Sequence, residues 1–445
     1  MTNLLCTETA EEAISPPVSI PAPARRLSLS HNFVWALGGN VTFAACQGAV
    51  LVLLAKATDP AMVGRFALAL AITAPLFLLT NLQLRAVQAT DALGHYRFGH
   101  YLALRLLTTV AALATLPIIL LVAGYSWSFA AVAFVIGIGK SFDALNDVMY
   151  GLVQKHERLD RGGMARITAG IATLSGLGIL LWTTGSLLWA AIGWAAGHGV
   201  VTLAARGWVG DDILTQEDET SEQPRLFSPL FDWGQLGQLA ILALPMGVVM
   251  MLGSLQINAP RYFIEHYLDD KLLGIYAAIA YLMLAGHMVS LAMGQAVTPR
   301  LAKHFAAAEF SQYFAIIFRL LGIAVAGGAL AVVLTATLGS TVLSLLFTPE
   351  YAQHTPVLIC LSVVLGIEAA TSFLGEAMTA TRKFKVQTPV LLAALIAAAV
   401  SCVLFIPPYG LMGAAIATGI GAFTQFIGSA LVVMWAVRER RKESA

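Results

Sequence analysis

The chain has 445 residues, of which 58% are hydrophobic and only 11% are charged, and its formal net charge is +1. Soluble domains carry about 25% charged residues, more than twice the fraction in this chain. The mean hydropathy of the chain is +0.78, which is strongly apolar. The near-neutral charge gives no support for nucleic-acid binding. Apolar runs of about 20 residues, long enough to cross a bilayer, recur along the whole length. The sequence therefore predicts a polytopic, all-α integral membrane protein.

Twelve membrane-spanning helices are predicted, because the apolar runs are long and continuous. Strands of a membrane barrel would instead be about 10 residues long and would alternate in polarity. The twelve spans are expected at 33–55, 62–84, 99–122, 129–152, 164–184, 187–205, 238–260, 272–296, 313–337, 354–381, 387–406 and 411–436.

The distribution of Lys and Arg agrees with this count. With the N-terminus inside, 21 of the 26 Lys and Arg residues fall on the inner side and 4 on the outer side, and Lys140 lies within a span. Such an inner excess is the positive-inside pattern of membrane proteins. Both termini are therefore predicted to be cytoplasmic.

The spans divide the chain into two halves with polar segments around them. The acidic residues and Pro-rich stretch near the N-terminus predict a disordered cytoplasmic leader and no signal peptide. The predicted organisation is a leader at 1–32, a six-helix lobe at 33–205, a cytoplasmic linker at 206–236, a second six-helix lobe at 237–436 and a basic cytoplasmic tail at 437–445.

The two halves contain a weak internal repeat. The stretch LAKATDPAMVGRFALAL (54–70) aligns with IEHYLDDKLLGIYAAIA (264–280) at a constant offset of 210, and Asp59 and Gly64 match Asp269 and Gly274. Both stretches join the first two spans of their half across the outer face. Because each half has an even number of spans, the repeats are parallel and related by a pseudo-two-fold axis along the membrane normal. Two lobes around a central cavity are expected.

Ionisable residues lie within two spans that occupy equivalent places in the two halves. Lys140, Asp143 and Asp147 are spaced i, i+3, i+7 and share one helical face. Charges at mid-membrane cost about 2.5–3.5 kcal/mol each on insertion scales, so this face is expected to line the cavity. A buried Lys140–Asp143 pair is the alternative. In span ten, Glu368 and Glu376 also share one face.

Four stretches resemble polysaccharide-biosynthesis flippases of the Wzx type, in the multidrug/oligosaccharidyl-lipid/polysaccharide (MOP) exporter superfamily. They are LAKATDPAMVGRFALALAITAPLFLLTNLQLRAVQATD (54–91), GKSFDALNDVMYGLVQKHERLD (139–160), APRYFIEHYLDDKLLGIYAAIAYL (259–282) and GIEAATSFLGEAMTATRKFKVQTP (366–389). The resemblance implies a flippase of the inner (plasma) membrane that moves undecaprenyl-pyrophosphate-linked oligosaccharide from the cytoplasmic to the periplasmic leaflet for surface polysaccharide assembly. It implies membrane lipid and a glycan-bearing lipid as partners, with the polysaccharide polymerase and chain-length machinery as further candidates.

The pyrophosphate that the resemblance implies requires cations. The candidates are Lys140, Arg85 and Arg300, with Arg261 at an outer helix end as a residue for release. Arg suits phosphate because its planar fork donates to two oxygens at once. The alternative for each arginine is an anchor at the membrane surface.

Amides and carboxylates complete the set of candidate residues. Asn146, Gln256 and Asn258 are candidate substrate contacts, although amides in membrane helices often hold helices together instead. An ion gradient of H⁺ or Na⁺ is expected to drive the cycle through an intramembrane carboxylate. The candidates are Glu368 first, because it lies near mid-depth, followed by Asp143, Asp147 and Glu376, the last of which could instead pair with an inner-loop arginine.

Several alternatives remain open at this level. Another MOP branch, a drug/cation antiporter or a peptidoglycan-precursor flippase, would share the architecture. A membrane-integral polysaccharide polymerase or ligase is disfavoured because the predicted outer loops are short. No Walker, zinc or Gly-x-Ser-x-Gly motif occurs, and the four cysteines form no framework, so no catalytic site, cofactor, metal or structural disulfide is expected.

Overall fold

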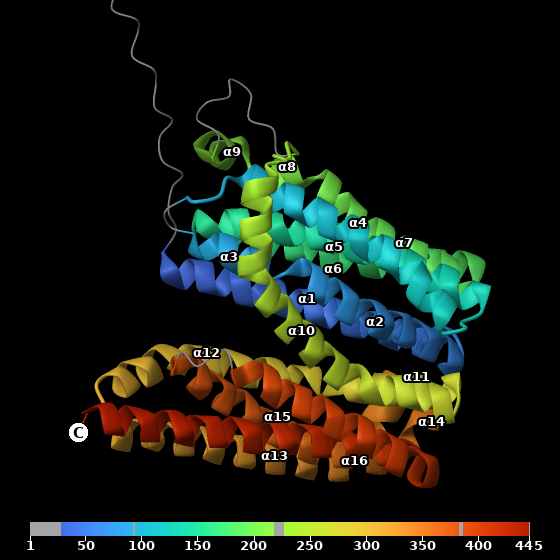
Figure 1. The fold of residues 1–445 in the computed structure, drawn as a ribbon. Coiled ribbons are helices and arrows are strands. Elements are labelled where there is room, and N and C mark those ends of the chain that lie inside the picture. The colour runs from blue at the N-terminus through green and yellow to red at the C-terminus, as the bar shows by residue number, and fades with distance from the viewer. Residues whose placement is uncertain (1–27, 92–93, 218–226, 382–385, 445) are drawn as a thin grey trace, which may run out of the picture.

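The computed structural model describes residues 28–91, 94–217, 227–381 and 386–444, and within these ranges all the regular structure is helical (Figure 1). Most of the predicted leader lies outside the described residues. Its last four residues belong to the first helix, α1, which begins at Leu29. Ser28 caps this helix by accepting a hydrogen bond from the backbone N–H of His31.

The helices of the first half follow the predicted spans closely. They are α1 (Leu29–Ala57), α2 (Pro60–Asn81), α3 (Leu84–Thr90), α4 (Phe98–Val122), α5 (Trp127–Lys155), α6 (Leu159–Thr184), α7 (Leu187–Leu203), α8 (Ala205–Val209) and α9 (Asp211–Glu217). The second half contains α10 (Trp233–Tyr267), α11 (Asp270–Leu282), α12 (Leu284–Ala306), α13 (Phe310–Leu346), α14 (Pro349–Ala352), α15 (Thr355–Ala380) and α16 (Gln387–Ser444).

The helix lengths define a multi-pass membrane protein. Within the described residues, ten helical segments are long and apolar enough to cross a membrane, and α7 is a shorter apolar helix of 17 residues. Two of the ten join consecutive helices, α2 with α3 and α11 with α12, and another covers Gln387–Lys442 of α16. The all-α membrane fold is thus confirmed. The count of twelve, which includes α7 and divides α16 in two, stays a prediction.

The last helix, α16, is bent back on itself. Its backbone leaves the helical conformation at Gly410 (φ 55°, ψ −132°), where the missing side chain makes positive φ accessible. Beyond the bend, Gly413 packs against the carbonyl of Phe405 and Gly428 packs against the side chain of Val390. The two arms therefore lie side by side, and they contain the last two predicted spans.

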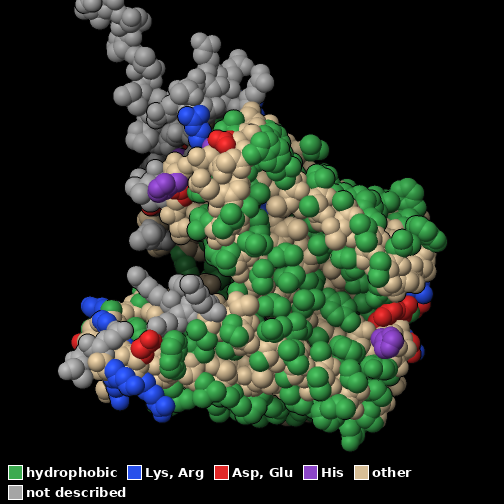
Figure 2. Space-filling view, in the orientation of Figure 1, with side chains coloured by type: hydrophobic (Ala, Val, Ile, Leu, Met, Phe, Trp, Pro, Cys, Tyr) green, Lys and Arg blue, Asp and Glu red, His purple; other side chains and the backbone are tan. Residues whose placement is uncertain are grey.

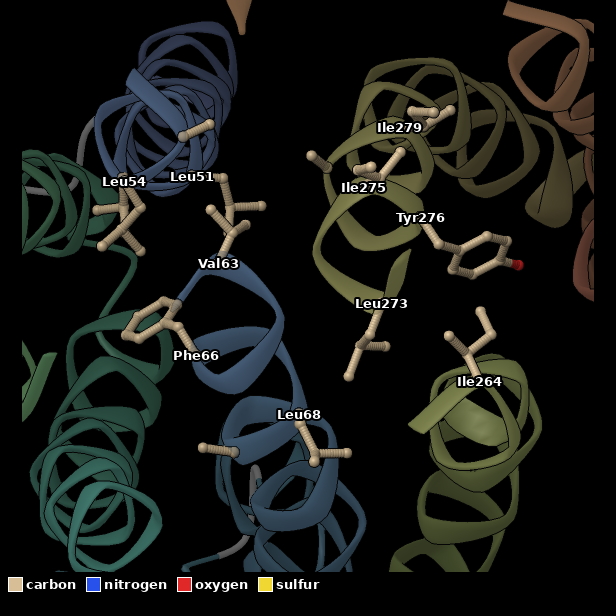
Figure 3. Close-up of a cluster of buried hydrophobic side chains, with 14 of the residues drawn as sticks. Leu51, Leu54, Val63, Phe66, Leu68, Ile264, Leu273, Ile275, Tyr276 and Ile279 are labelled. Carbon is tan, nitrogen blue, oxygen red and sulfur yellow. The ribbon is translucent and has the colours of Figure 1, made fainter. Parts of the chain in front are cut away.

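The two lobes are joined at one end by a shared hydrophobic core. Leu54, Val63 and Phe66 of the first lobe belong to the same buried cluster as Ile264 and Leu273 of the second (Figure 3). This is the end at which Asp59 and Asp269, the repeat-related residues, cap α2 and α11. The predicted outer end is thus sealed by apolar packing between the lobes.

At the opposite end the described cores are separate. One cluster surrounds Leu84, Tyr101 and Leu152 in the first lobe, and another surrounds Tyr313 and Met378 in the second. Figure 2 shows a hollow between the lobes at this end. The central space is therefore open toward the predicted cytoplasmic side.

The predicted linker contains structure in its first part. Val209 and Ile213, from α8 and α9, are fully buried, and Asp212 accepts two hydrogen bonds from Arg161, at 2.7 and 2.9 Å. Burial alone would raise the pKa of Asp212, but the hydrogen bonds and charge of Arg161 outweigh it and the pKa is lowered. Residues 206–217 are thus docked onto the first lobe, and 218–226 lie outside the described residues.

The first helix of the second half, α10, bridges the two lobes (Figure 1). Its first turns contribute Leu236, Leu239 and Ala243 to the core of the first lobe. Further along, the Gln256 amide donates to Gln425 of α16 at 3.1 Å. The packing boundary between the lobes therefore falls inside α10 beyond Ala243, whereas the predicted boundary at residue 237 lies in the first turns of this helix.

Candidate functional site

The polar face of α5 is the centre of a charged cluster in the first lobe. Lys140, Asp143 and Asp147 are all partly buried in this lobe, as their spacing predicts. Helices α3, α4 and α6 surround this face and each contributes an arginine. We refer to Lys140, Arg85, Arg105, Arg166, Asp143 and Asp147 together as the basic cluster.

Asp147 is held by two of these arginines. Its carboxylate lies 3.1 Å from Nη2 of Arg105 and 3.9 Å from Nη1 of Arg85. The Arg105 side chain is 0% exposed and also donates to Oδ1 of Asn81 at 2.5 Å. Because a buried arginine needs a counter-charge, Asp147 serves first as the partner that keeps Arg105 in place.

A turn between α2 and α3 directs Arg85 toward α5. Leu82 and Gln83 both adopt left-handed backbone conformations, with φ of 52° and 51°, which is costly for residues other than Gly. The turn brings Nε of Arg85 to 3.0 Å from Oε1 of Gln154. The strained turn therefore positions the charged side chain of Arg85.

Arg166 approaches from the other side. Its guanidinium lies 5.1 Å from the ring centroid of Tyr150, and that of Arg85 lies 5.7 Å from the same ring. Cations at such distances are attracted by the face of an aromatic ring. Both guanidiniums line a pocket whose other walls are Ala36, Asn40, Tyr150, Val153, Leu159, Gly162 and Gly163. Two cations thus face one accessible pocket.

Deeper in the lobe, Lys140 and Asp143 have separate partners. Nζ of Lys140 lies 5.8 Å from the ring centroid of Trp194, and Oδ1 of Asp143 lies 3.9 Å from Nδ1 of His198. No salt bridge joins Lys140 to Asp143 in the described structure. The alternative of a buried Lys140–Asp143 pair is therefore wrong for this conformation.

The charges of the basic cluster do not cancel. Four permanent cations, namely Lys140, Arg85, Arg105 and Arg166, surround the two carboxylates of Asp143 and Asp147. The formal balance is +2, in a region where each unpaired charge costs several kcal/mol when water is excluded. Such an excess is characteristic of a site that receives an anion, and arginine forks suit the oxygens of phosphate groups.

The predicted amides lie in contacts between or within helices. Asn146 is buried, and its Nδ2 is 3.5 Å from the carbonyl oxygen of His198 on α7. Gln256 bonds Gln425 across α10 and α16, and Asn258 bonds the Ser254 carbonyl one turn earlier at 2.9 Å. Of the three, Asn146 alone adjoins the basic cluster.

The other two predicted cations lie outside the basic cluster. Arg300 is exposed on α12 of the second lobe. Arg261 lies on α10 toward the sealed end, where it donates to Oδ1 of Asn258 at 2.5 Å and its Nε has no acceptor among the described residues. The structure therefore does not bring Arg300 and Arg261 to the side chains of Lys140 and Arg85.

The two glutamates of α15 differ in their surroundings. Glu376 accepts a hydrogen bond from the Thr298 hydroxyl at 2.6 Å. Glu368 is partly buried near Tyr276, and no hydrogen bond or salt bridge satisfies it in the described part of the chain. Both belong to the second lobe, away from the basic cluster. Within the described residues no group of three His, Cys, Asp or Glu side chains could hold a metal ion.

Three members of the site were not identified from the sequence. Arg105 and Arg166 each lie seven residues beyond the first residue of α4 and α6, and both were interpreted as positive-inside residues. His198 lies in the middle of the apolar α7. The predicted spans place Arg105 six residues inside span three but Arg166 only two residues inside span five, so depth was an available signal for Arg105 alone.

Comparisons with known proteins agree with this architecture. The chain is 28% identical over 404 residues to the capsular polysaccharide biosynthesis protein CapF of Staphylococcus aureus, covering 89% of this chain and 97% of that protein. No family model matches the chain.

Solved structures share the fold at low sequence identity. The lipid II flippase MurJ in an inward closed conformation has a TM-score of 0.71 and 12% identity, covering 90% of this chain and 87% of that one. An inward-facing multidrug resistance MATE family transporter of the MOP superfamily has a TM-score of 0.64 and 15% identity, covering 96% and 98%. The fold is thus that of MOP-superfamily transporters, which confirms the predicted resemblance at this level. The chain is thus similar in sequence to a capsular polysaccharide biosynthesis protein and similar in fold to MOP-superfamily transporters.

Proposed function

We propose that this protein is a flippase of the inner membrane that moves a diphosphate-linked lipid oligosaccharide from the cytoplasmic to the periplasmic leaflet. The cargo class is an undecaprenyl-pyrophosphate-linked glycan for surface polysaccharide assembly. The basic cluster binds the diphosphate while the hollow between the lobes holds the sugars. The polyprenyl tail remains in the surrounding lipid.

One observation carries this proposal, namely the formal charge of +2 in a partly enclosed site of the first lobe. Arg85 and Arg166 face the same pocket. Lys140 lies deeper in the lobe, on the face of α5 that also carries Asp143 and Asp147. A diphosphate that is esterified at both ends, by the lipid and by the sugar, carries two negative charges, which match the excess of the basic cluster. The similarity to CapF, whose name assigns it to capsular polysaccharide biosynthesis, supports the same class of cargo.

The charge of the site also bears on the alternatives. A drug/cation antiporter requires an acidic pocket for a cationic substrate, and the excess here has the opposite sign. A peptidoglycan-precursor flippase also carries a lipid diphosphate, so the basic cluster is compatible with it. The similarity to CapF favours the capsular or related glycan over the peptidoglycan precursor.

Ion coupling belongs to the same proposal. Glu368 is the leading carboxylate in the second lobe, because burial disfavours its charged form and no basic partner in the described structure offsets this. Protonation of Glu368 would be linked to the cargo through the change between inward- and outward-open states. Both termini are taken to be cytoplasmic, as the excess of inner Lys and Arg requires.

The proposal is tested in vesicles that contain the purified protein and a fluorescent undecaprenyl-diphosphate oligosaccharide. We expect a gradient-dependent transfer of the labelled lipid between leaflets, measured by its accessibility to an impermeant quencher. The double variant Arg85→Gln, Arg166→Gln should lose at least tenfold in transfer rate, because it removes both forks from the pocket. Arg319→Gln, an exposed arginine on α13, is the matched control. Equal rates in the double variant and in the wild type would reject the assigned site.

A further inference from the structure

The imidazole of His198 is an unsatisfied group next to the basic cluster. The residue is 1% exposed, and neither Nδ1 nor Nε2 has a hydrogen-bond partner in the described structure. Its backbone carbonyl, in contrast, accepts from Thr202 at 3.1 Å. Buried polar atoms are normally paired, so two unpaired ring nitrogens require an explanation.

The surroundings of the ring are arranged for a change of charge. Trp194 and Phe43 pack edge-on against it, with centroid distances of 4.6 and 6.2 Å. Nδ1 faces Oδ1 of Asp143 at 3.9 Å, which is too long for a hydrogen bond. A shortening of about 1 Å would create a charge-assisted hydrogen bond between an imidazolium and this carboxylate.

Other charged groups around the pair oppose that change in the empty site. The charges that act on the imidazole are those of Asp143, Lys140 and Arg166. Those that act on Asp143 include Arg105 of α4 as well. Asp143 attracts a proton to the ring, whereas Lys140 and Arg166 repel it. An anion bound to the cations cancels the repulsion and leaves the attraction of Asp143.

We propose that His198 is a proton acceptor built into the anion site, so that binding of a diphosphate is accompanied by uptake of a proton on the imidazole. This inference rests on the proposed function, since it takes the bound anion to be the diphosphate of the cargo. The proton comes from solvent and bonds to a ring nitrogen, and Asp143 pairs with the imidazolium formed. Glu368, in the other lobe, is linked to the cargo only through the conformational change.

The experiment measures proton uptake on binding of farnesyl diphosphate to the detergent-purified full chain. Titration calorimetry in buffers of different ionisation enthalpy, between pH 6 and pH 8, gives the number of protons exchanged. Protonation of the diphosphate itself is common to all variants, so the difference between wild type and His198→Gln isolates the ring. We expect the wild type to take up as much as one proton more than the variant.

The sign of the pH dependence follows from linkage. A ligand that binds with proton uptake binds more tightly as the pH falls, and one proton corresponds to a tenfold change in Kd per pH unit. Wild type and His198→Gln should therefore have similar Kd values at pH 8, where the ring is neutral in both states. Their Kd values should diverge by up to tenfold for each unit below the onset of ring protonation.

Two further variants keep the test decisive. Asp143→Asn retains the ring of His198 but removes its counter-charge, so proton uptake should fall toward that of His198→Gln. His287→Gln, a partly buried histidine on α12 of the other lobe, should behave as the wild type. Equal proton uptake in wild type and His198→Gln would overturn the inference and leave the flippase proposal standing. Failure of farnesyl diphosphate to bind the wild type would overturn both.

Discussion

Gly64 and Gly274 contact each other across the two lobes at equivalent positions of the internal repeat. A Cβ on Gly64 would lie 1.9 Å from the carbonyl oxygen of Asp270, and a Cβ on Gly274 would lie 1.9 Å from that of Pro60. Because residues 60 and 64 match 270 and 274 at the same offset of 210, these are one contact seen from either lobe. The pseudo-two-fold axis passes between the two glycines. The packing that closes the outer end of the two lobes, the outer seal, consists there of direct contact between their backbones.

Substitution of Gly64 should therefore open the seal. In Gly64→Ala the new methyl group cannot fit at 1.9 Å, so the outer ends of α2 and α11 must separate. Overpacking of this kind costs about 1–3 kcal/mol in a tight interface, and the cost applies to the inward-open state only. We expect a shift toward outward-open molecules, measured by labelling of an engineered cysteine near Val63 with an impermeant reagent added from outside.

A matched control for this variant is Gly327→Ala on α13, where nothing lies within 4 Å of the added atom. Its labelling should be unchanged, and its thermal stability should be unchanged or slightly higher because Ala favours the helix. Unaltered labelling in Gly64→Ala would show that the glycine contact does not control the outer seal.

Removal of Arg105 should damage the structure of the first lobe before it affects transport. Arg105→Leu leaves Asp147 in the lobe with only the more distant Arg85 as a partner. Breaking a buried pair by removal of one member costs about 3–5 kcal/mol. We expect a lower amount of protein in the membrane and a lower Tm in detergent. The double variant Arg105→Leu, Asp147→Leu should recover a large part of both, and a double variant no more stable than the single one would exclude this pairing as the cause.

Lys140 is expected to act on cargo and not on folding. Its ammonium group faces Trp194, and no carboxylate depends on it for a salt bridge in the described structure. Lys140→Ala should therefore abolish polysaccharide export while the protein remains at its normal level, assayed by surface polysaccharide and by immunoblot of membranes. Lys140→Arg, which retains the charge, is the control and should keep measurable export. Normal export by Lys140→Ala would remove Lys140 from the binding site.

The two glutamates of α15 provide a paired test of ion coupling. Glu368→Gln preserves shape and fixes the neutral state, so transport in reconstituted vesicles should lose its response to a pH gradient. Glu376 is satisfied by the Thr298 hydroxyl, so Glu376→Gln should keep more of the activity and its pH response. If Glu368→Gln responds to the gradient as the wild type does, coupling resides in the first lobe, where Asp143 and His198 are the next candidates.

Parts of the candidate site could be predicted from local spacing. The i, i+3, i+7 pattern of Lys140, Asp143 and Asp147 fixes a shared helix face without knowledge of any neighbour. The partners of these residues could not be predicted, because Arg105, Arg166 and His198 come from other helices and only packing brings them within reach. The Lys140–Asp143 salt bridge, which the spacing permits, is absent from the described structure, where Lys140 faces Trp194 and Asp143 faces His198 of α7.

The sequence by itself determined that this is a multi-pass membrane protein with a duplicated architecture, because the length and polarity of apolar runs are set by the bilayer and not by tertiary contacts. The sequence also indicated the internal repeat, whose equivalent residues Gly64 and Gly274 contact each other in the structure. The tertiary structure decided which end of the molecule is closed and that α10 belongs to both lobes. It also decided that the cations outnumber the carboxylates around α5. These properties depend on contacts between residues more than 200 positions apart, which the local sequence pattern does not specify.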